Sequence, residues 1–308
     1  MIQINNLSKK YGSKVAVKGI SFSVKSGEIV GFLGPNGAGK STTMNVLTGY
    51  LSASGGSVAV AGHDVLDDAL EARRHIGYLP EQPPLYFDMT VDEYLDFVYE
   101  LKGAKKIKSR HIKEICERVG LTDVRRRLIK NLSKVYKQRV GLAQALIGDP
   151  DVLILDEPTV GLDPNQIVEI RNLIKNLGRD RTVILSTHII PEVVAVCERI
   201  VVINNGEIVA DDTVDNLMHD IAGEAKYEAK IEGDSKRIEQ ILRSIPGVTK
   251  VECKKEIYTI TVREGVDIRN KVFLAAGEND LSLLSFAPVS VSLEEVFARL
   301  TKKGGKKQ

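Results

Sequence analysis

The residues best suited to chemistry in this sequence lie between Gly34 and Thr42, which read Gly-Pro-Asn-Gly-Ala-Gly-Lys-Ser-Thr. The stretch follows an apolar run ending at Leu33 and precedes another beginning at Met44, so the pattern predicts a turn between a strand and a helix. Glycines let successive backbone N–H groups point at phosphate oxygens, and the helix dipole adds positive charge. A match over the whole motif disfavours an ordinary turn with a chance lysine. The sequence therefore predicts a phosphate-binding loop.

Two side chains of the loop and two carboxylates have distinct expected roles. Lys40 is placed to reach the β- and γ-phosphates, and the Ser41 hydroxyl is placed to ligate Mg²⁺. Asp156 and Glu157 end an aliphatic run that starts at Val152, and the C-terminal ends of buried parallel strands are where α/β sheets bind ligands. We expect Asp156 to hold Mg²⁺ through water, and Glu157 to orient or deprotonate an attacking water.

Two further side chains can be assigned a role only in combination with the phosphate-binding loop. His188 follows a second buried strand, residues 182–187, and a histidine at a strand end is often only hydrogen-bonded. Its position at the end of a strand of the same type as the carboxylate strand favours a role in the site. Tyr11 lies in a predicted polar loop, residues 8–14, where its ring could stack on adenine. On its own, a structural tyrosine is the better interpretation of that residue.

The surrounding pattern indicates how these residues are positioned. Helical periodicity between Thr90 and Ile147 predicts a helical insertion, within which Ser133 is a suitable N-cap. A helix that begins at a serine offers a second site for an anion. Asn205 and Gly206 predict a hairpin turn. Other strands are expected at residues 2–7, 15–24, 58–61 and 76–79, and a helix at residues 165–177.

Composition bounds the class of protein. The chain has 308 residues, of which 43% are hydrophobic, so we expect two domains with proper cores. A net charge of +2 argues neither for nor against an anionic partner. The 3 cysteines are far apart and lack metal-ligand spacing, which fits a reducing cytosol. No apolar run approaches the roughly 18 residues of a membrane span, and the N-terminus does not resemble a signal peptide. Membrane association is therefore expected only through a partner.

In this order the motifs resemble those of the ATP-binding subunits of ABC transporters, over roughly the first 220 residues. The loop at Gly34 is similar to Walker A, and residues 153–157 are similar to Walker B. Leu132–Gln138 lies where the family has its Leu-Ser-Gly-Gly-Gln signature. His188 matches the switch histidine, and Asp163 matches the D-loop aspartate. The nucleotide contacts that the resemblance implies are Tyr11, Val17, Gly34, Pro35, Asn36, Gly37, Ala38, Gly39, Lys40, Ser41 and Thr42.

The resemblance also implies a fold and an assembly. The fold is an α/β P-loop NTPase with a RecA-like core, an antiparallel β subdomain and a helical subdomain at about residues 88–148, all within residues 1–221. Two copies, or one copy and a homologous ATPase, would enclose two MgATP head to tail, with the signature of one subunit facing the nucleotide of the other. The implied signature contacts are Ser133, Lys134 and Val135, and the implied catalytic residues are Glu157, His188 and Lys40.

Two residues depart from the family pattern. Val135 replaces the second glycine of the signature, and its methyl groups would stand between the backbone N–H and the phosphate. A loss of about 1.4 kcal/mol there would slow turnover tenfold, and the charge of Lys134 would offset part of that loss. Glu81 stands where the family usually has glutamine, with Gln82 next to it. A carboxylate ligates Mg²⁺ at least as well as an amide, so both residues remain candidates.

From about residue 222 onward the sequence departs from the ATPase pattern. Strand and helix signals follow the order βαββαβ, which predicts a ferredoxin-like α+β module in residues 222–308. A helix is expected at Leu293–Leu300, followed by a basic tail at Thr301–Gln308. The simplest interpretation of the tail is a solvated chain end, and a contact with anionic lipid is the less favoured alternative. Similar appendages occur on ATPase subunits of ABC-2 type exporters, which implies docking, dimerisation or regulation.

These patterns predict a cytoplasmic ATPase that dimerises around two MgATP and drives export through a separate membrane permease, which holds it at the membrane. A nucleotide-gated module with impaired hydrolysis is an alternative, raised by Val135. A soluble ABC ATPase acting on DNA or ribosomes would usually carry paired cassettes or a long coiled coil. The sequence has one Walker A motif and no sustained heptads, so no nucleic acid partner is expected. The cargo would be selected by the permease, so this sequence does not name it.

Overall fold

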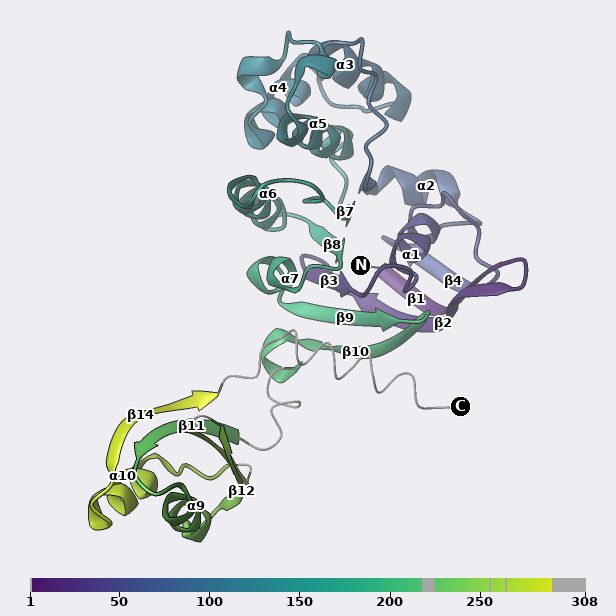
Figure 1. The fold of residues 1–308 in the computed structure, drawn as a ribbon. Helices are drawn as coiled ribbons and strands as arrows, with labels where there is room; N and C mark the ends of the chain where they lie inside the picture. Colours follow the sequence, from purple (N-terminus) through teal and green to yellow (C-terminus); the bar gives the residue numbers. More distant parts are fainter. Residues whose placement is uncertain (1, 218–224, 255, 264, 290–308) are drawn as a thin grey trace. The chain divides into compact units, whose positions relative to one another are not determined.

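The computed structural model describes residues 2–217, 225–254, 256–263 and 265–289 (Figure 1). The described residues divide after Val214 into two compact units. Each unit has a hydrophobic core of its own, so each is described separately. Among the described residues, no helix is both long and apolar enough to span a membrane.

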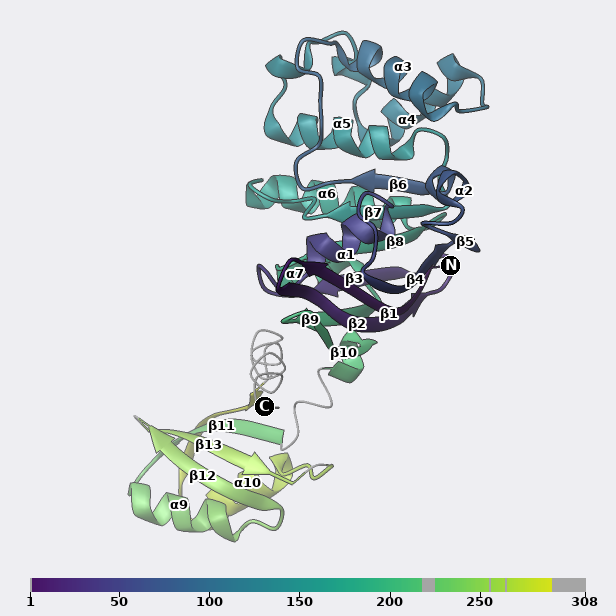
Figure 2. The ribbon, with the colours of Figure 1, turned by 90° about the vertical axis from the view of Figure 1, so that its right-hand side faces the viewer.

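A six-stranded sheet runs through the described part of the first unit (Figure 2). Its strands are β3 (Ile29–Leu33), β6 (Ile76–Leu79), β7 (Val152–Asp156), β8 (Thr182–Thr187), β9 (Arg199–Asn204) and β10 (Glu207–Thr213). Their order is β10-β9-β3-β8-β7-β6, and all neighbours are parallel except β10 with β9. The strands β3, β7 and β8 are buried along their whole length, which explains their mainly aliphatic sequences without alternation.

The predicted hairpin at the edge of this sheet is confirmed. Asn205 and Gly206 join β9 to β10 with φ angles of 50° and 80°. Two consecutive positive φ angles match the twist of paired strands and favour an asparagine-glycine pair.

A second, antiparallel sheet lies beside the first. It comprises β1 (Ile2–Tyr11), β2 (Lys14–Val24), β4 (Gly55–Val60) and β5 (His63–Asp64), in the order β2-β1-β4-β5. The predicted polar loop at residues 8–14 is wrong, because β1 and β2 remain paired as far as Tyr11 and Lys14. Only Gly12 and Ser13 form the turn. Register shifts and polar side chains interrupt the alternation of polar and apolar residues here, so the sequence gives no clear strand signal for this part of the pairing.

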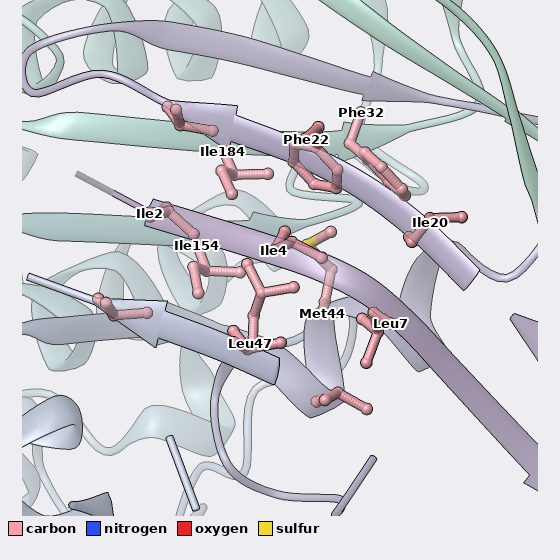
Figure 3. Close-up of a cluster of buried hydrophobic side chains, with 14 of the residues drawn as sticks. Ile2, Ile4, Leu7, Ile20, Phe22, Phe32, Met44, Leu47, Ile154 and Ile184 are labelled. Atoms are coloured by element: carbon pink, nitrogen blue, oxygen red, sulfur yellow. The ribbon is translucent and has the colours of Figure 1, made fainter. Parts of the chain in front are cut away.

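The main core fills the space between the two sheets and encloses α1 (Lys40–Leu47), as Figure 3 shows. Ile4 and Phe22 project from the antiparallel sheet, Met44 from α1, and Ile154 and Ile184 from the parallel strands. All are buried, and full burial of such a side chain contributes roughly 1.5–3 kcal/mol. This packing holds the beginning of α1, and therefore the preceding loop, against the parallel sheet.

The described part of the first unit also contains helices. On the side of the parallel sheet away from α1 lie α6 (Pro164–Leu177) and α7 (Ile190–Val196), of which α7 contacts β3 and β8 (Figure 1). The predicted helical insertion is present, and Thr90 begins its first helix with a reciprocal capping box to Glu93. Other helices that lie wholly within the described residues are α2 (Ala69–Arg74), α3 (Val91–Lys102), α4 (Lys108–Val119), η1 (Thr122–Val124), η2 (Ile129–Asn131) and α5 (Lys134–Leu146).

The described part of the second unit follows the predicted order of strands and helices. The elements are β11 (Ala225–Glu232), α9 (Ser235–Ser244), β12 (Val248–Lys254), β13 (Ile257–Val262), α10 (Arg269–Glu278) and β14 (Ser282–Val289). The sheet is antiparallel, in the order β12-β13-β11-β14. Ile238 and Val272 of the two helices pack with Tyr258 of the sheet in one core. The expected helix Leu293–Leu300 and the basic tail lie outside the described residues.

Candidate functional site

A cavity of about 1280 Å³ adjoins the loop between β3 and α1. Segments that are far apart in the sequence meet there, including the residues that follow β6, β7 and β8. The described residues that line it are Tyr11, Lys14, Val15, Ala16, Lys18, Asn36, Gly37, Gly39, Lys40, Ser41, Thr42, Glu81, Glu157, Val160, His188, Asn205 and Glu207. The structure thus brings together residues of the loop, of the carboxylate strand and of the histidine strand.

Glycine is required at two positions of this loop. Gly39 has a φ of 111°, and a Cβ there would lie 2.8 Å from the carbonyl oxygen of Ala16. A Cβ on Gly34 would lie 2.4 Å from the carbonyl oxygen of Ile203. The backbone therefore packs closely against β2 and β9, as only glycine permits, while α1 begins directly after Gly39.

Three charged or titratable side chains converge at one side of the cavity. The ammonium of Lys40 donates hydrogen bonds to the carbonyl oxygens of Gly34, at 2.8 Å, and Pro35, at 3.3 Å. The same Nζ lies 3.4 Å from Oε1 of Glu157. The Nδ1 of His188 lies 3.0 Å and 2.9 Å from the two oxygens of Glu157. Because an ionised carboxylate only accepts hydrogen bonds, we assign the proton of this contact to Nδ1.

The backbone of Glu157 is held in an uncommon conformation. Its φ of 47° is in the left-handed region, which a residue with a long side chain rarely adopts. The Glu157 N–H donates to the carbonyl oxygen of Ser186 at 2.8 Å, and its own carbonyl oxygen accepts from the Val160 N–H at 3.2 Å. Strain of this kind persists only where surrounding contacts enforce it, and it is concentrated at functional sites.

Asp156 is the more deeply buried of the two carboxylates, with 2% of its surface exposed. Burial raises the pKa of Asp156, and hydrogen bonds from Ser186 and Ser41 act in the opposite direction. The Ser186 hydroxyl donates to Oδ1 at 2.7 Å. Ser41 and Asp156 thus present two oxygen donors side by side, a set that fits a hard cation such as Mg²⁺. Among the described residues, no group of three or more His, Cys, Asp or Glu side chains could hold a metal.

Of the two non-polar residues expected to contact the nucleotide from β1 and β2, one lines the cavity and the other is buried in the core. Tyr11 ends β1, lines the cavity and has 46% of its surface exposed. Val17 is fully buried in the main core, so its expected contact with a nucleotide is wrong. The residues of β2 that line the cavity instead are Lys14, Val15, Ala16 and Lys18. Asn205 was not expected there, because the sequence indicates its turn but not the parallel pairing of β9 with β3.

Glu81 and Gln82 differ in their positions. Both are exposed, and of the two only Glu81 is among the described residues that line the cavity. Glu81 follows β6, whose Tyr78 donates a hydrogen bond to Asn45 Oδ1 of α1 at 3.2 Å. Burial, followed by the charges of Asp156 and Glu81, raises the pKa of Tyr78, so this hydroxyl remains a donor. The structure therefore places the carboxylate, and not the amide, beside the loop.

The signature residues lie at the beginning of α5 and do not line the cavity of their own chain. The predicted N-cap is confirmed, because Ser133 Oγ accepts from the Tyr136 N–H at 3.5 Å. Val135 has only 8% of its surface exposed, so its methyl groups are buried within the chain. This corrects the expectation that they would stand in front of a phosphate. The exposed Lys134 lies close to Gly161, two residues before Asp163, because a Cβ on Gly161 would lie 2.0 Å from the Lys134 Nζ.

Asp163 has a structural role that the sequence pattern did not indicate. It is the N-cap of α6, and its Oδ1 accepts from the Gln166 N–H at 3.0 Å. The Gln166 side chain in turn accepts from the Asp163 N–H at 3.5 Å, which completes a capping box. Asp163 is not among the described residues that line the cavity.

Comparison with known proteins agrees with these motifs. Residues 17–160 match the family model described as ABC transporter, and residues 137–195 also match a model described as an AAA domain. The ATP-binding subunit of an ABC transporter has a solved structure that superimposes with a TM-score of 0.65 at 28% identity, over 72% of this chain and 93% of that one. The dimeric post-hydrolysis structure of the ATP-binding cassette MJ0796, with ADP and Pi, superimposes with a TM-score of 0.63 at 27% identity, over 70% and 99%. The predicted P-loop ATPase fold is confirmed for the first unit.

Two curated relatives match along nearly the full length. The linearmycin resistance ATP-binding protein LnrL of Bacillus subtilis (strain 168) is 34% identical over 98% of this chain and 98% of its own length. The bacitracin transport ATP-binding protein BcrA of Bacillus licheniformis is 32% identical over 99% and 98%. The chain therefore belongs to the ATP-binding subunits of ABC transporters, which are ATPases.

Proposed function

We propose that this ATPase dimerises around two MgATP and drives export through a separate membrane permease. The convergence of Lys40, Glu157 and His188 on one cavity carries the proposal, because it unites a phosphate-binding cation with a carboxylate and a histidine. Relatives of the same length are named for resistance to linearmycin and for bacitracin transport, which supports a transporter of the export type. Such a subunit would sit at the cytoplasmic face of the membrane, bound to its permease.

The side chains of the site suit hydrolysis of the terminal phosphate. Loop N–H groups and the start of α1 would bind the phosphates, while Tyr11 at the far end of β1 would stack on adenine. Glu157 would accept a hydrogen bond from the attacking water and take its proton. Lys40 and His188 would stabilise the charge that develops on the transferred phosphoryl group.

The oxygen donors beside the loop fit the cation that accompanies ATP. Ser41 and Asp156 would hold Mg²⁺, and Glu81, which lines the same cavity as Ser41, would be a third oxygen ligand. The bound cation would neutralise negative charge on the phosphates of ATP. Because Mg²⁺ retains several waters and uses phosphate oxygens, a set of two or three protein oxygens is sufficient.

Dimerisation would bring the signature of one subunit to the nucleotide of the other. The exposed N-terminus of α5, capped by Ser133, is an anion-binding end of a helix, and it does not face the cavity of its own chain. Two structures of the related cassette MJ0796 are dimeric, which supports dimerisation of this subunit. Burial of Val135 within the chain supports a hydrolysing subunit over one with impaired hydrolysis.

Substitution of Ser133 tests the proposed dimer. Ser133→Asp keeps a good N-cap for α5 but adds a negative charge that would repel the γ-phosphate of the partner's ATP. In a Glu157→Gln background, MgATP should produce a dimer in light scattering, and the added Ser133→Asp should abolish it. Ser133→Thr keeps both the cap and the neutral charge, so it should preserve the dimer. A dimer that persists with Ser133→Asp would contradict the head-to-tail arrangement.

For the second unit we propose a ferredoxin-like accessory module that serves docking, dimerisation or regulation. Its described strand order, β12-β13-β11-β14 with antiparallel neighbours, and its βαββαβ sequence of elements support the assignment.

A further inference from the structure

A buried carboxylate behind the site has no role in the mechanism so far. Glu192 lies in the first turn of α7, and 1% of its surface is exposed. It accepts hydrogen bonds from the hydroxyls of Thr159, at Oε1, and of Thr187, at Oε2, the latter at 2.9 Å. Buried carboxylates need such donors, because an unpaired one would cost several kcal/mol.

The two threonines belong to the two segments that carry the catalytic pair. Thr159 is two residues after Glu157, and Thr187 ends β8 directly before His188. Glu192 therefore links, through one carboxylate, the loop behind Glu157 to the strand end behind His188.

Thr187 also touches Glu157 directly. Its Oγ1 lies 3.3 Å from Oε2 of Glu157 and 2.9 Å from Oε2 of Glu192, and it accepts the Ile189 N–H at 3.1 Å. A hydroxyl has one proton, and the shorter distance favours donation to Glu192. The oxygen of Thr187 is thereby fixed against one side of the Glu157 carboxylate, which also contacts Lys40 and His188.

We propose that Glu192 is a positioning residue for ATP hydrolysis, which sets the spacing of Glu157 and His188 through the hydroxyls of Thr159 and Thr187. The inference rests on the proposed role of Glu157. A residue that acts in this way should affect the chemical step and leave nucleotide binding nearly unchanged, since neither Glu192 nor its threonine partners line the cavity.

Thr187→Val and Glu192→Gln test the proposal in the full chain. Thr187→Val keeps the side-chain shape and removes the hydroxyl, and Glu192→Gln replaces one acceptor oxygen by an amide donor. Each should lower kcat at least tenfold, while KM for MgATP and the Kd of a fluorescent ATP analogue change less than twofold. Thr187→Ser restores the hydroxyl and should return kcat to within threefold of the parent.

Thr182→Val is the matched control, because it removes a buried hydroxyl at the opposite end of β8. Thr182 Oγ1 accepts from the Gly27 N–H at 3.0 Å, far along the strand from the site. This variant should keep kcat within twofold, and its thermal midpoint should fall about as much as that of Thr187→Val.

Three results would overturn the proposal. Thr187→Val and Glu192→Gln with kcat within twofold of the parent would show that the link has no effect on hydrolysis. A loss that Thr187→Ser does not recover, or that Thr182→Val shares, would show a general structural defect. If Glu157→Gln itself still hydrolysed ATP at the parent rate, the role of Glu157 would fail, and the proposal would fail with it.

Discussion

At the scale of single residues, Val135 shows why a motif has to be interpreted together with burial. The sequence indicates only that a β-branched residue replaces a signature glycine, which suggested a steric obstacle. In the structure the side chain is directed inward, with 8% of its surface exposed, at the second position of α5. The backbone N–H there belongs to the first turn of the helix and has no partner within the helix ladder. A valine at this position therefore contributes to packing.

Val135→Gly should consequently destabilise the protein without raising kcat for ATP hydrolysis. Loss of the buried side chain and the added freedom of glycine together cost about 2–3 kcal/mol, or roughly 5–10 °C in Tm. We expect kcat to stay within threefold of the parent, as measured by steady-state hydrolysis beside thermal unfolding. Lys134→Gly is the control, because it adds the same backbone freedom at an exposed neighbouring position and should lower Tm much less. A tenfold rise in kcat for Val135→Gly would restore the steric interpretation.

At the scale of elements, strong local patterns were predicted well and tertiary placement was not. The aliphatic strands β7 and β8 and the serine-capped helix α5 agree with the expected segments, because buried strands and caps leave clear local signals. The short helices α2 and α7 were not anticipated, since six or seven residues hold too few turns for a periodic pattern. The Glu192 link was missed for the same reason, because it depends on where α7 lies.

One ion-paired cluster joins the helical subdomain to the parallel sheet. Asp149 lies between α5 and β7 and forms an ion pair with Lys106 of the loop after α3. Its Oδ1 accepts a hydrogen bond from Nη2 of Arg181, before β8, at 2.5 Å. The hydrogen bond from Lys106, and then that from Arg181, lowers the pKa of Asp149 below its ordinary value of 3.8, against an opposing effect of burial. The guanidinium of Arg181 is 10% exposed, so it depends on this partner.

Asp149→Asn should therefore lower the free energy of unfolding by an amount that depends on pH. A carboxylate with a lowered folded pKa contributes stability above its unfolded pKa and loses it as the pH falls through the folded value. Because 38% of the Asp149 side chain is exposed, solvent screens its ion pairs. We therefore expect the substitution to lower the free energy of unfolding by only about 1 kcal/mol at pH 7. Asparagine also suits the φ of 58° at this position.

Urea unfolding of Asp149→Asn and the parent at pH 7 and near pH 3 measures this contribution. The difference between the two chains should be present at pH 7 and shrink at the lower pH, where the parent carboxylate becomes protonated. Asp88→Asn is the control, since Asp88 is 91% exposed in its pair with Lys130 and should change stability little at either pH. A difference that grows on acidification would show that the ion pairs are not its source.

At the scale of the whole molecule, an ATPase unit is followed by a second unit with a core of its own. Relatives named for linearmycin resistance and bacitracin transport match along nearly their full length, so the second unit is a shared part of such proteins. The order of its elements could be predicted because each strand and helix has a clear hydrophobic period.

The most direct test of the account is steady-state MgATP hydrolysis by the full chain beside Glu157→Gln. Glutamine keeps the size of the side chain and its contact with His188, but it cannot take a proton from water. We predict measurable turnover for the parent, a loss of at least about a hundredfold for Glu157→Gln, and unchanged binding of a fluorescent ATP analogue. Turnover by Glu157→Gln within fivefold of the parent would contradict the central claim that this carboxylate activates the attacking water.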